Sequence, residues 1–184
     1  TRFGQTVILV LIQLGGLGIM TFGVLAMQLV GRKISFRSQV ALYDIFYQKH
    51  AADEFRKNLR WVVLLTLSFE ALGAALLIWS VQSPPFAHVS MFDSVFHAIS
   101  AFCNAGFSTF RDSLISMRGN LVLMTVVSAL IVLGGLGYTV VLELITQACR
   151  RLLRRPAAIG WSLQTRVVLA TSCILVALGL LFLV

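Results

Sequence analysis

Four long apolar segments, each of 18 or more residues, restrict the fold of this chain more than any other feature of its sequence. They cover residues 6–30, 61–81, 121–148 and 167–184. A helix needs roughly 20 apolar residues to cross the hydrocarbon core of a bilayer, and a backbone in lipid must satisfy its own hydrogen bonds, so each segment is predicted to be a helix. Only 12% of the residues are charged, against about 25% in a typical soluble domain. We therefore predict an all-α, multi-pass membrane protein.

The basic residues lie in the connections between these apolar segments. Residues 31–60 carry seven Lys and Arg against three acidic residues, and residues 149–166 carry five Arg and no acid, whereas residues 82–120 carry two Arg. The positive-inside rule places the first two connections in the cytoplasm and the third outside the cell membrane. Membrane orientation thus accounts for the net charge of +8, and we expect no nucleic-acid partner.

The two ends of the chain lead us to expect an internal piece of a longer polypeptide. The chain starts at Thr1, and it stops at Val184 within an apolar segment. The three cysteines have neither metal-site spacing nor an obvious pairing, so we expect no disulfide framework; they are Cys103, Cys149 and Cys173.

The outer connection contains a shorter apolar helix over residues 91–103, with Ser90 and Asp93 in the spacing of a capping box at its start. Thirteen helical residues span roughly 20 Å, which is too short to cross a bilayer and indicates a re-entrant helix. The small and polar residues 104–109, here called the return segment, suit an extended path back. Alternatively, residues 91–103 lie flat on the outer interface, with His97 at the headgroups, and the sequence does not decide between these readings.

An internal repeat relates two of the apolar segments. Gln-Leu-Gly-Gly-Leu-Gly at residues 13–18 recurs as Val-Leu-Gly-Gly-Leu-Gly at residues 132–137, 119 residues later. A repeat of this length predicts a repeated structural unit, here a helix, a re-entrant helix and a glycine-bearing helix. Each glycine within a helix costs about 1 kcal/mol relative to alanine. We favour close helix packing as the base explanation for these glycines, and a bend or close contact beneath a pore is a second, compatible interpretation.

The residues between Phe96 and Ser108, Phe-His-Ala-Ile-Ser-Ala-Phe-Cys-Asn-Ala-Gly-Phe-Ser, resemble a pore helix and filter of the Trk/Ktr/HKT potassium transporters. The two glycine-bearing helices resemble the family's inner helices. Residues 60–81, with Glu70 and Gly73, are similar to the outer helix of the second repeat, and residues 165–184 resemble the start of the third.

The resemblance implies a potassium-channel-like pore built from four such outer-helix, pore-helix, inner-helix (M1-P-M2) units in one polypeptide. It also implies a homodimer and a cytoplasmic nucleotide-binding regulatory subunit of the TrkA/KtrA type, in a bacterial inner membrane. On this division, residues 1–30 are the inner helix of the first repeat and residues 61–148 the complete second repeat. Residues 167–184 begin the third, and residues 31–60 and 149–166 are the cytoplasmic connections.

The implied substrate is the potassium ion, which sheds its water in a narrow filter and takes backbone carbonyl oxygens instead. Carbonyls turn inward only where the backbone adopts unusual dihedral angles, which glycine permits, so Gly106 is the principal candidate. The C-terminal end of the re-entrant helix adds partial negative charge that favours a cation. The full set of candidate filter residues is Asn104, Ala105, Gly106, Phe107 and Ser108, with potassium at Asn104, Ala105 and Gly106.

Two acids within apolar segments are candidates for functional roles. We expect Glu70 to have a structural role behind the filter, and Glu143 to reach the interface or an arginine. His97 is expected to be a packed or interfacial residue rather than a ligand. The arginines at the start of the second cytoplasmic connection indicate topology first, and a contact with lipid headgroups or a regulator second.

The predicted function is potassium uptake across the cell membrane. The alternative is a sodium-selective transporter or an ion-coupled secondary transporter with broken helices. Parallel repeats favour the pore, because both glycine-bearing helices are predicted to run in the same direction. We expect no cofactor and no enzyme, since the sequence has no paired acids, metal-spaced His/Cys set or nucleophile–base pair.

Overall fold

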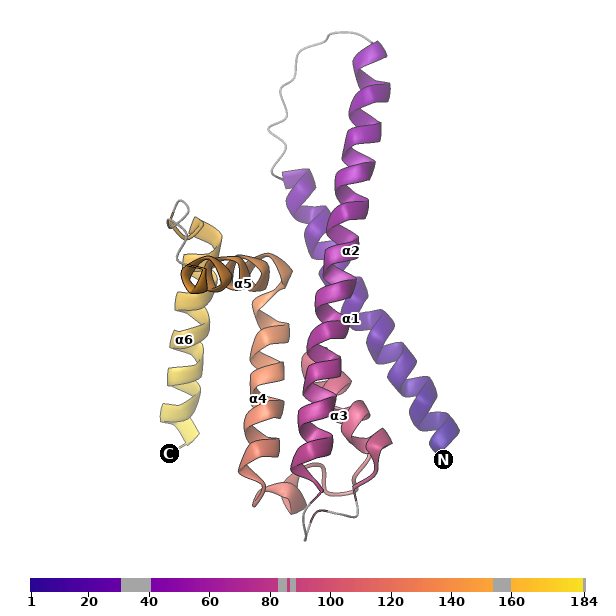
Figure 1. The fold of residues 1–184 in the computed structure, drawn as a ribbon, viewed down its shortest axis with the longest axis vertical. Coiled ribbons are helices and arrows are strands. Elements are labelled where there is room, and N and C mark those ends of the chain that lie inside the picture. Colours follow the sequence, from indigo (N-terminus) through magenta and orange to yellow (C-terminus); the bar gives the residue numbers. More distant parts are fainter. Residues whose placement is uncertain (31–40, 83–85, 87–88, 154–159, 184) are drawn as a thin grey trace. The chain divides into compact units, whose positions relative to one another are not determined.

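The computed structural model describes residues 1–30, 41–82, 86, 89–153 and 160–183, and the side chains of these except residues 19–30, 41–56 and 183 (Figure 1). The described residues form helices joined by irregular segments, with no strand among them. The prediction of an all-α membrane protein is therefore confirmed at the level of secondary structure. The chain divides into two compact units, residues 1–131 and 132–184.

The first unit is built around α2 (Ala41–Ser80), which packs against α1 (Arg2–Val30) and against the shorter α3 (Met91–Phe102). A 3-10 turn, η1 (Ile115–Met117), leads into α4 (Leu121–Leu136). The core forms where apolar side chains of three helices are buried, including Leu77 of α2, Phe96 of α3 and Leu123 of α4.

One close contact in this unit involves a glycine of α2. A Cβ atom added at Gly73 would lie 2.6 Å from Cδ1 of Leu130, so α2 lies close against α4 and a side chain at Gly73 would require Leu130 to move. Large apolar side chains on the other side of α2, such as Leu67 and Trp79, are exposed, as expected for a face that meets lipid.

The helix α2 is much longer than its apolar segment. It begins at Ala41, not near Trp61, and continues for 40 residues to Ser80. Residues 41–60 of the predicted cytoplasmic connection are therefore helical, residues 31–40 lie outside the described part, and the side of the membrane on which this connection lies stays a prediction. Hydropathy locates the part of a helix that suits lipid, here Lys57–Ser80, and does not register a polar continuation.

Two of the described helices are long and apolar enough to cross a membrane, Lys57–Ser80 and Leu163–Phe182. A third crossing results if the bent pair of Leu121–Leu136 and Tyr138–Leu152 counts as one, and Arg2–Gly18 is a shorter apolar helix. The sequence had predicted four crossings.

The second unit contains the end of α4, α5 (Tyr138–Leu152) and α6 (Leu163–Leu183). The predicted single helix over residues 121–148 is wrong, because the chain bends by 110° between α4 and α5. Gly137, at the bend, has φ 82° and ψ 152°, a combination that is essentially restricted to glycine. At this copy of the repeat the bend, which we had ranked second to packing, is what occurs.

Candidate functional site

The start of α3 is closed by the capping box that the sequence predicted. Ser90 is the N-cap, the amide of Asp93 donates to Ser90 Oγ at 3.2 Å, and the Ser90 amide donates to Asp93 Oδ2 at 3.1 Å. Arg2, at the start of α1, forms an ion pair with Asp93 Oδ1 at 3.2 Å. Burial raises the pKa of Asp93, but the hydrogen bonds that the carboxylate accepts, chiefly from Ser90, outweigh this effect and hold the pKa below its usual value.

His97 joins α3 to the return segment. Its Nδ1 lies 2.7 Å from the carbonyl oxygen of Asp93, and its Nε2 lies 2.8 Å from Ser108 Oγ. The imidazole is buried and stacks on the ring of Phe110, with 4.8 Å between the ring centroids. With both nitrogens engaged, His97 is a packed residue, as predicted.

The end of α3 is a Schellman motif that turns the chain into the return segment. The amide of Asn104 donates to the carbonyl of Ala101 at 3.0 Å, and the amide of Ala105 donates to that of Ser100 at 2.9 Å. Asn104 occupies the left-handed position that closes the motif, with φ 54°. The sequence analysis missed this turn, although asparagine is the commonest substitute for glycine there.

Gly106 has the unusual backbone conformation that the sequence predicted, with φ 71°. Residues 105–108 have no helical or strand conformation. Within the described part of the chain, the carbonyl oxygens of Asn104, Ala105 and Gly106 accept no hydrogen bond. These three carbonyls are therefore available to a ligand, and their role toward an ion stays a prediction.

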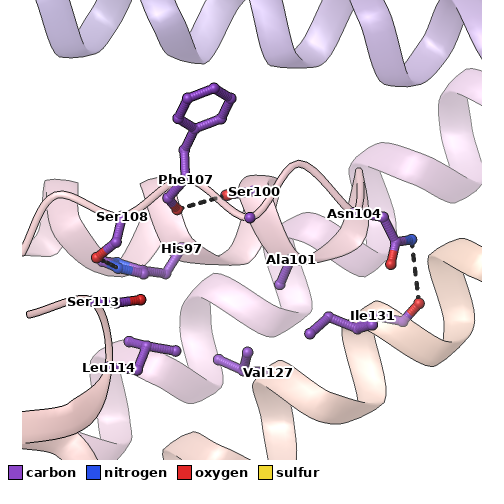
Figure 2. A pocket seen from close by; sticks show the side chains of 11 residues that line it. His97, Ser100, Ala101, Asn104, Phe107, Ser108, Ser113, Leu114, Val127 and Ile131 are labelled. Carbon is purple, nitrogen blue, oxygen red and sulfur yellow. Dashed lines mark hydrogen bonds between the residues drawn. The ribbon is translucent and has the colours of Figure 1, made fainter.

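The other two candidate filter residues are fastened to α3. The carbonyl of Phe107 accepts a hydrogen bond from Ser100 Oγ at 2.7 Å, while the ring of Phe107 is half exposed and points away from Ser100 (Figure 2). The hydroxyl of Ser108 lies against His97 and also accepts from the amide of Phe110 at 3.1 Å. Among the described residues, the carbonyls of Asn104, Ala105, Gly106 and Ser108 thus accept no hydrogen bond, while the Phe107 carbonyl and the Ser108 hydroxyl anchor the segment to α3.

A cavity of about 210 Å³ lies beside the return segment. Figure 2 shows side chains of α3, the return segment and α4 around it, with the Asn104 amide donating to the carbonyl of Ile131 at 3.3 Å. At about 30 Å³ per molecule, its volume suits several waters. Polar and apolar groups both line it: His97, Ser100, Ala101, Asn104, Gly106, Phe107, Ser108, Ser113, Leu114, Val127 and Ile131.

Glu70 of α2 lies at the C-terminal end of α3, in agreement with a structural role behind the predicted filter. The residue is 4% exposed. Its Oε2 accepts from Gln13 Nε2 at 3.0 Å, and its Oε1 lies 3.6 Å from Sγ of Cys103, the C-cap of α3. Gly16 contacts the same cysteine, since a Cβ there would lie 2.5 Å from Sγ. Sequence reasoning did not connect Gln13 or Cys103 with Glu70, because the pairs are far apart in the chain.

Glu143, the second acid, fastens α5 to the start of α6 within the second unit. Its Oε1 accepts from the amide of Ser162 at 2.8 Å, and its Oε2 accepts from the Ser162 and Thr165 hydroxyls. Donors from Ser162 and Thr165 therefore satisfy this carboxylate, and its predicted contact with the interface or an arginine stays a prediction.

The apolar helices define a multi-pass membrane protein. Over residues 1–184 the chain matches the family TrkH, described as a cation transport protein. The chain therefore belongs to the TrkH cation transport family, which agrees with the resemblance seen in its sequence.

Curated relatives support the same assignment. Similar proteins include the Ktr system potassium uptake protein B of Bacillus subtilis, 36% identical over 98% of this chain and 39% of that protein. The potassium/sodium uptake protein NtpJ of Enterococcus hirae is 36% identical over 74% of this chain and 30% of its own length. The Ktr system potassium uptake protein B of Vibrio alginolyticus is 32% identical over 77% of this chain and 31% of its own length. The chain thus spans between about three tenths and two fifths of the length of these relatives.

Proposed function

We propose that this chain forms part of a potassium-uptake pathway, in which the backbone carbonyls of Asn104, Ala105 and Gly106 replace water around the ion. The observation that carries the proposal is the return segment itself. It leaves a buried helix by a Schellman turn and contains two positive φ angles, and its carbonyls at Asn104, Ala105 and Gly106 accept no hydrogen bond from the described residues. Unpaired backbone carbonyls are tolerated at membrane depth only where they line a watery cavity or bind a ligand.

The burial of α3 supports a re-entrant helix over one lying flat on the outer interface. Eight of its twelve residues are buried, whereas a helix in the interface keeps a polar face in water. The C-terminal end of α3 at Cys103 directs partial negative charge toward the return segment. Both features favour a cation there.

Potassium is the proposed ion because two of the similar proteins are named for potassium uptake and the third for potassium and sodium. A free-carbonyl ligand set suits a weakly hydrated monovalent cation. Sodium transport is the second candidate, and the name of the Enterococcus hirae relative is the observation that keeps it.

The rest of the proposed machinery lies outside this chain. One return segment contributes one of the four filter segments that the family resemblance implies, so the other three come from the remainder of the polypeptide. We propose a homodimer and a cytoplasmic nucleotide-binding regulatory subunit, in keeping with relatives that are named as parts of a Ktr system. We propose transport rather than catalysis.

The test is Gly106→Ser in the full-length protein, expressed in cells that lack other potassium importers. Serine at φ 71° is strained by roughly 1–2 kcal/mol, so we expect weaker potassium affinity, a lower potassium-over-sodium preference, or both, at normal membrane abundance. Because three filter segments are unchanged, some transport should remain. Gly119→Ser is the matched control, since Gly119 has no positive φ and a Cβ there meets only the ring of Phe86 at 3.8 Å. Unchanged affinity and selectivity in Gly106→Ser would exclude residues 104–108 as a filter segment.

A further inference from the structure

A cluster of three polar side chains lies where α3 ends, and each comes from a different helix: Glu70 is buried, while Gln13 and Cys103 are partly buried. Glu70 on α2 accepts from Gln13 on α1 through one carboxylate oxygen and from Cys103, the C-cap of α3, through the other. A carboxylate that is 4% exposed costs free energy unless it is paired with donors. Here both donors come from other helices, so the carboxylate holds three helices together at one point.

Cys103 is confined from two sides. Glu70 lies against its thiol, and on the α1 side a Cβ at Gly16 would lie 2.5 Å from the same sulfur and 3.0 Å from the Cys103 Cβ. The Cys103 side chain therefore packs between the Glu70 carboxylate and the backbone of α1 at Gly16, where no side chain intervenes. The side-chain oxygen of Gln13 is buried without a hydrogen-bond partner among the described residues. The hydrogen bond of the Gln13 side chain is therefore the one that its Nε2 donates to Glu70.

We propose that Glu70 is a positioning residue for the cation filter, acting through Cys103 to hold the first filter carbonyls in place. This inference rests on the proposed function of the return segment. Asn104 follows Cys103 directly and turns the chain with φ 54°, so a displacement of Cys103 moves the carbonyls of Asn104, Ala105 and Gly106 together. Sites that bind through fixed geometry lose function when their supporting residues allow shifts of about 0.5 Å.

A positioning role and a merely structural role predict different results. If Glu70 only stabilised the fold, its loss would lower the amount of protein in the membrane, and each remaining molecule would transport normally. If Glu70 positions the filter, its loss changes the apparent affinity for potassium and the preference over sodium at equal abundance. Membrane abundance and the apparent ion affinity of the protein are measured separately.

The experiment compares Glu70→Ala, Glu70→Gln and a control in the full-length protein, with potassium and sodium uptake normalised to membrane abundance. Glu70→Ala removes both contacts and should weaken the apparent potassium affinity roughly tenfold, with a reduced preference over sodium. Glu70→Gln keeps the size and an acceptor for Cys103, so it should retain most of both. Ser68→Ala is the control, because Ser68 lies on the same helix, is exposed, and bonds only the carbonyl of Leu64 in its own helix.

Coupling to Cys103 provides the second measurement, which also serves if Glu70→Ala does not reach the membrane. Gln13→Ala removes the donor that orients Glu70 and should shift affinity in the same direction. Adding Cys103→Ala to either variant should cost less than the sum of the single changes, because the residues act as one unit.

Normal affinity and selectivity in both Glu70→Ala and Gln13→Ala, or a loss confined to abundance, would overturn the inference. If Gly106→Ser nevertheless alters selectivity, the proposed filter stands and only the role of Glu70 fails. If Glu70→Ala alters selectivity while Gly106→Ser does not, the proposed filter is wrong, and the inference that depends on it is overturned as well.

Discussion

Two positive φ angles, two residues apart, shape the segment that follows α3. Asn104 closes the helix at φ 54° and Gly106 follows at φ 71°, with Ala105 between them hydrogen-bonded to Ser100. Alternation of this kind prevents both helix and strand, and it leaves the carbonyls of the segment without the ladder partners that regular structure supplies. Backbone chemistry, more than any side chain, therefore makes this segment a candidate ligand site.

Substitutions at Asn104 separate the backbone conformation from the side-chain contacts. Alanine at a left-handed position costs roughly 1–2 kcal/mol, whereas glycine adopts it freely. Both changes remove the amide that donates to the carbonyl of Ile131. We expect Asn104→Ala to lower the thermal stability of the purified full-length protein by about 1 kcal/mol more than Asn104→Gly does. Equal losses in the two variants would mean that the turn tolerates another conformation.

At the scale of single residues, the sequence predicted local conformation correctly where a residue type at that position has one common structural role. Gly106 was predicted to need an unusual φ, and Ser90 with Asp93 to form a cap, and the structure has both. The contacts of Glu70 could not be predicted, because its donors lie 57 and 33 residues away. Such pairs depend on how helices pack, which local patterns do not encode.

At the scale of helices, the two copies of the glycine repeat differ. In α1 the helix continues through Gly15, Gly16 and Gly18 to Val30, and Gly16 makes the close contact with Cys103. In the second copy the helix stops before Gly137, and the chain bends by 110°. The same motif therefore serves packing once and a break once, since a glycine lowers the cost of either outcome and tertiary contacts decide.

The contact between α1 and α3 is tested by Gly16→Ala. A Cβ at 2.5 Å from Cys103 Sγ must push the helices apart or rotate the cysteine, so we expect a destabilisation of about 1–3 kcal/mol in the full-length protein. Cys103→Ala removes the overlapping sulfur and should partly restore stability in the double variant. The measurement is thermal unfolding in detergent.

Gly15→Ala is the matched control for that contact. Nothing lies within 4 Å of a Cβ at Gly15, and alanine favours a helix by about 1 kcal/mol over glycine. The control should therefore be neutral or slightly stabilising. If Gly16→Ala behaves like Gly15→Ala, α1 does not approach Cys103 as closely as the structure has it.

Across the whole chain, hydropathy predicted the class of protein but not the lengths of its helices. The apolar segments predicted the membrane assignment correctly, because the number of apolar residues that a crossing helix needs is set by the thickness of the bilayer. The polar start of α2 was missed because hydropathy detects only the apolar part of a helix, and residues 41–56 are helical without being apolar. The bend at Gly137 was predicted only as a second interpretation, because an apolar segment of 28 residues reads equally well as one helix or two.

The orientation of the chain in the membrane is the last prediction, and it rests on the unequal charge of the connections. Arg118, before α4, belongs to the connection with two basic residues, while Arg151 at the end of α5 belongs to the one with five. Both side chains are exposed. In intact cells, a membrane-impermeant thiol reagent should label Arg118→Cys and spare Arg151→Cys, since the positive-inside rule keeps the arginine-rich connection in the cytoplasm.

Labelling must be read against the native thiols, of which Cys149 and Cys173 are exposed. The two variants are therefore made with Cys149→Ser and Cys173→Ser, and the parent protein with these two serines gives the background. Permeabilised cells should label both variants, which shows that Arg151→Cys is reactive once the reagent reaches it. If Arg151→Cys is labelled in intact cells and Arg118→Cys is not, the predicted orientation is wrong and the chain crosses the membrane in the opposite direction. The return segment would then open to the cytoplasm, and uptake from outside would require a different entry path.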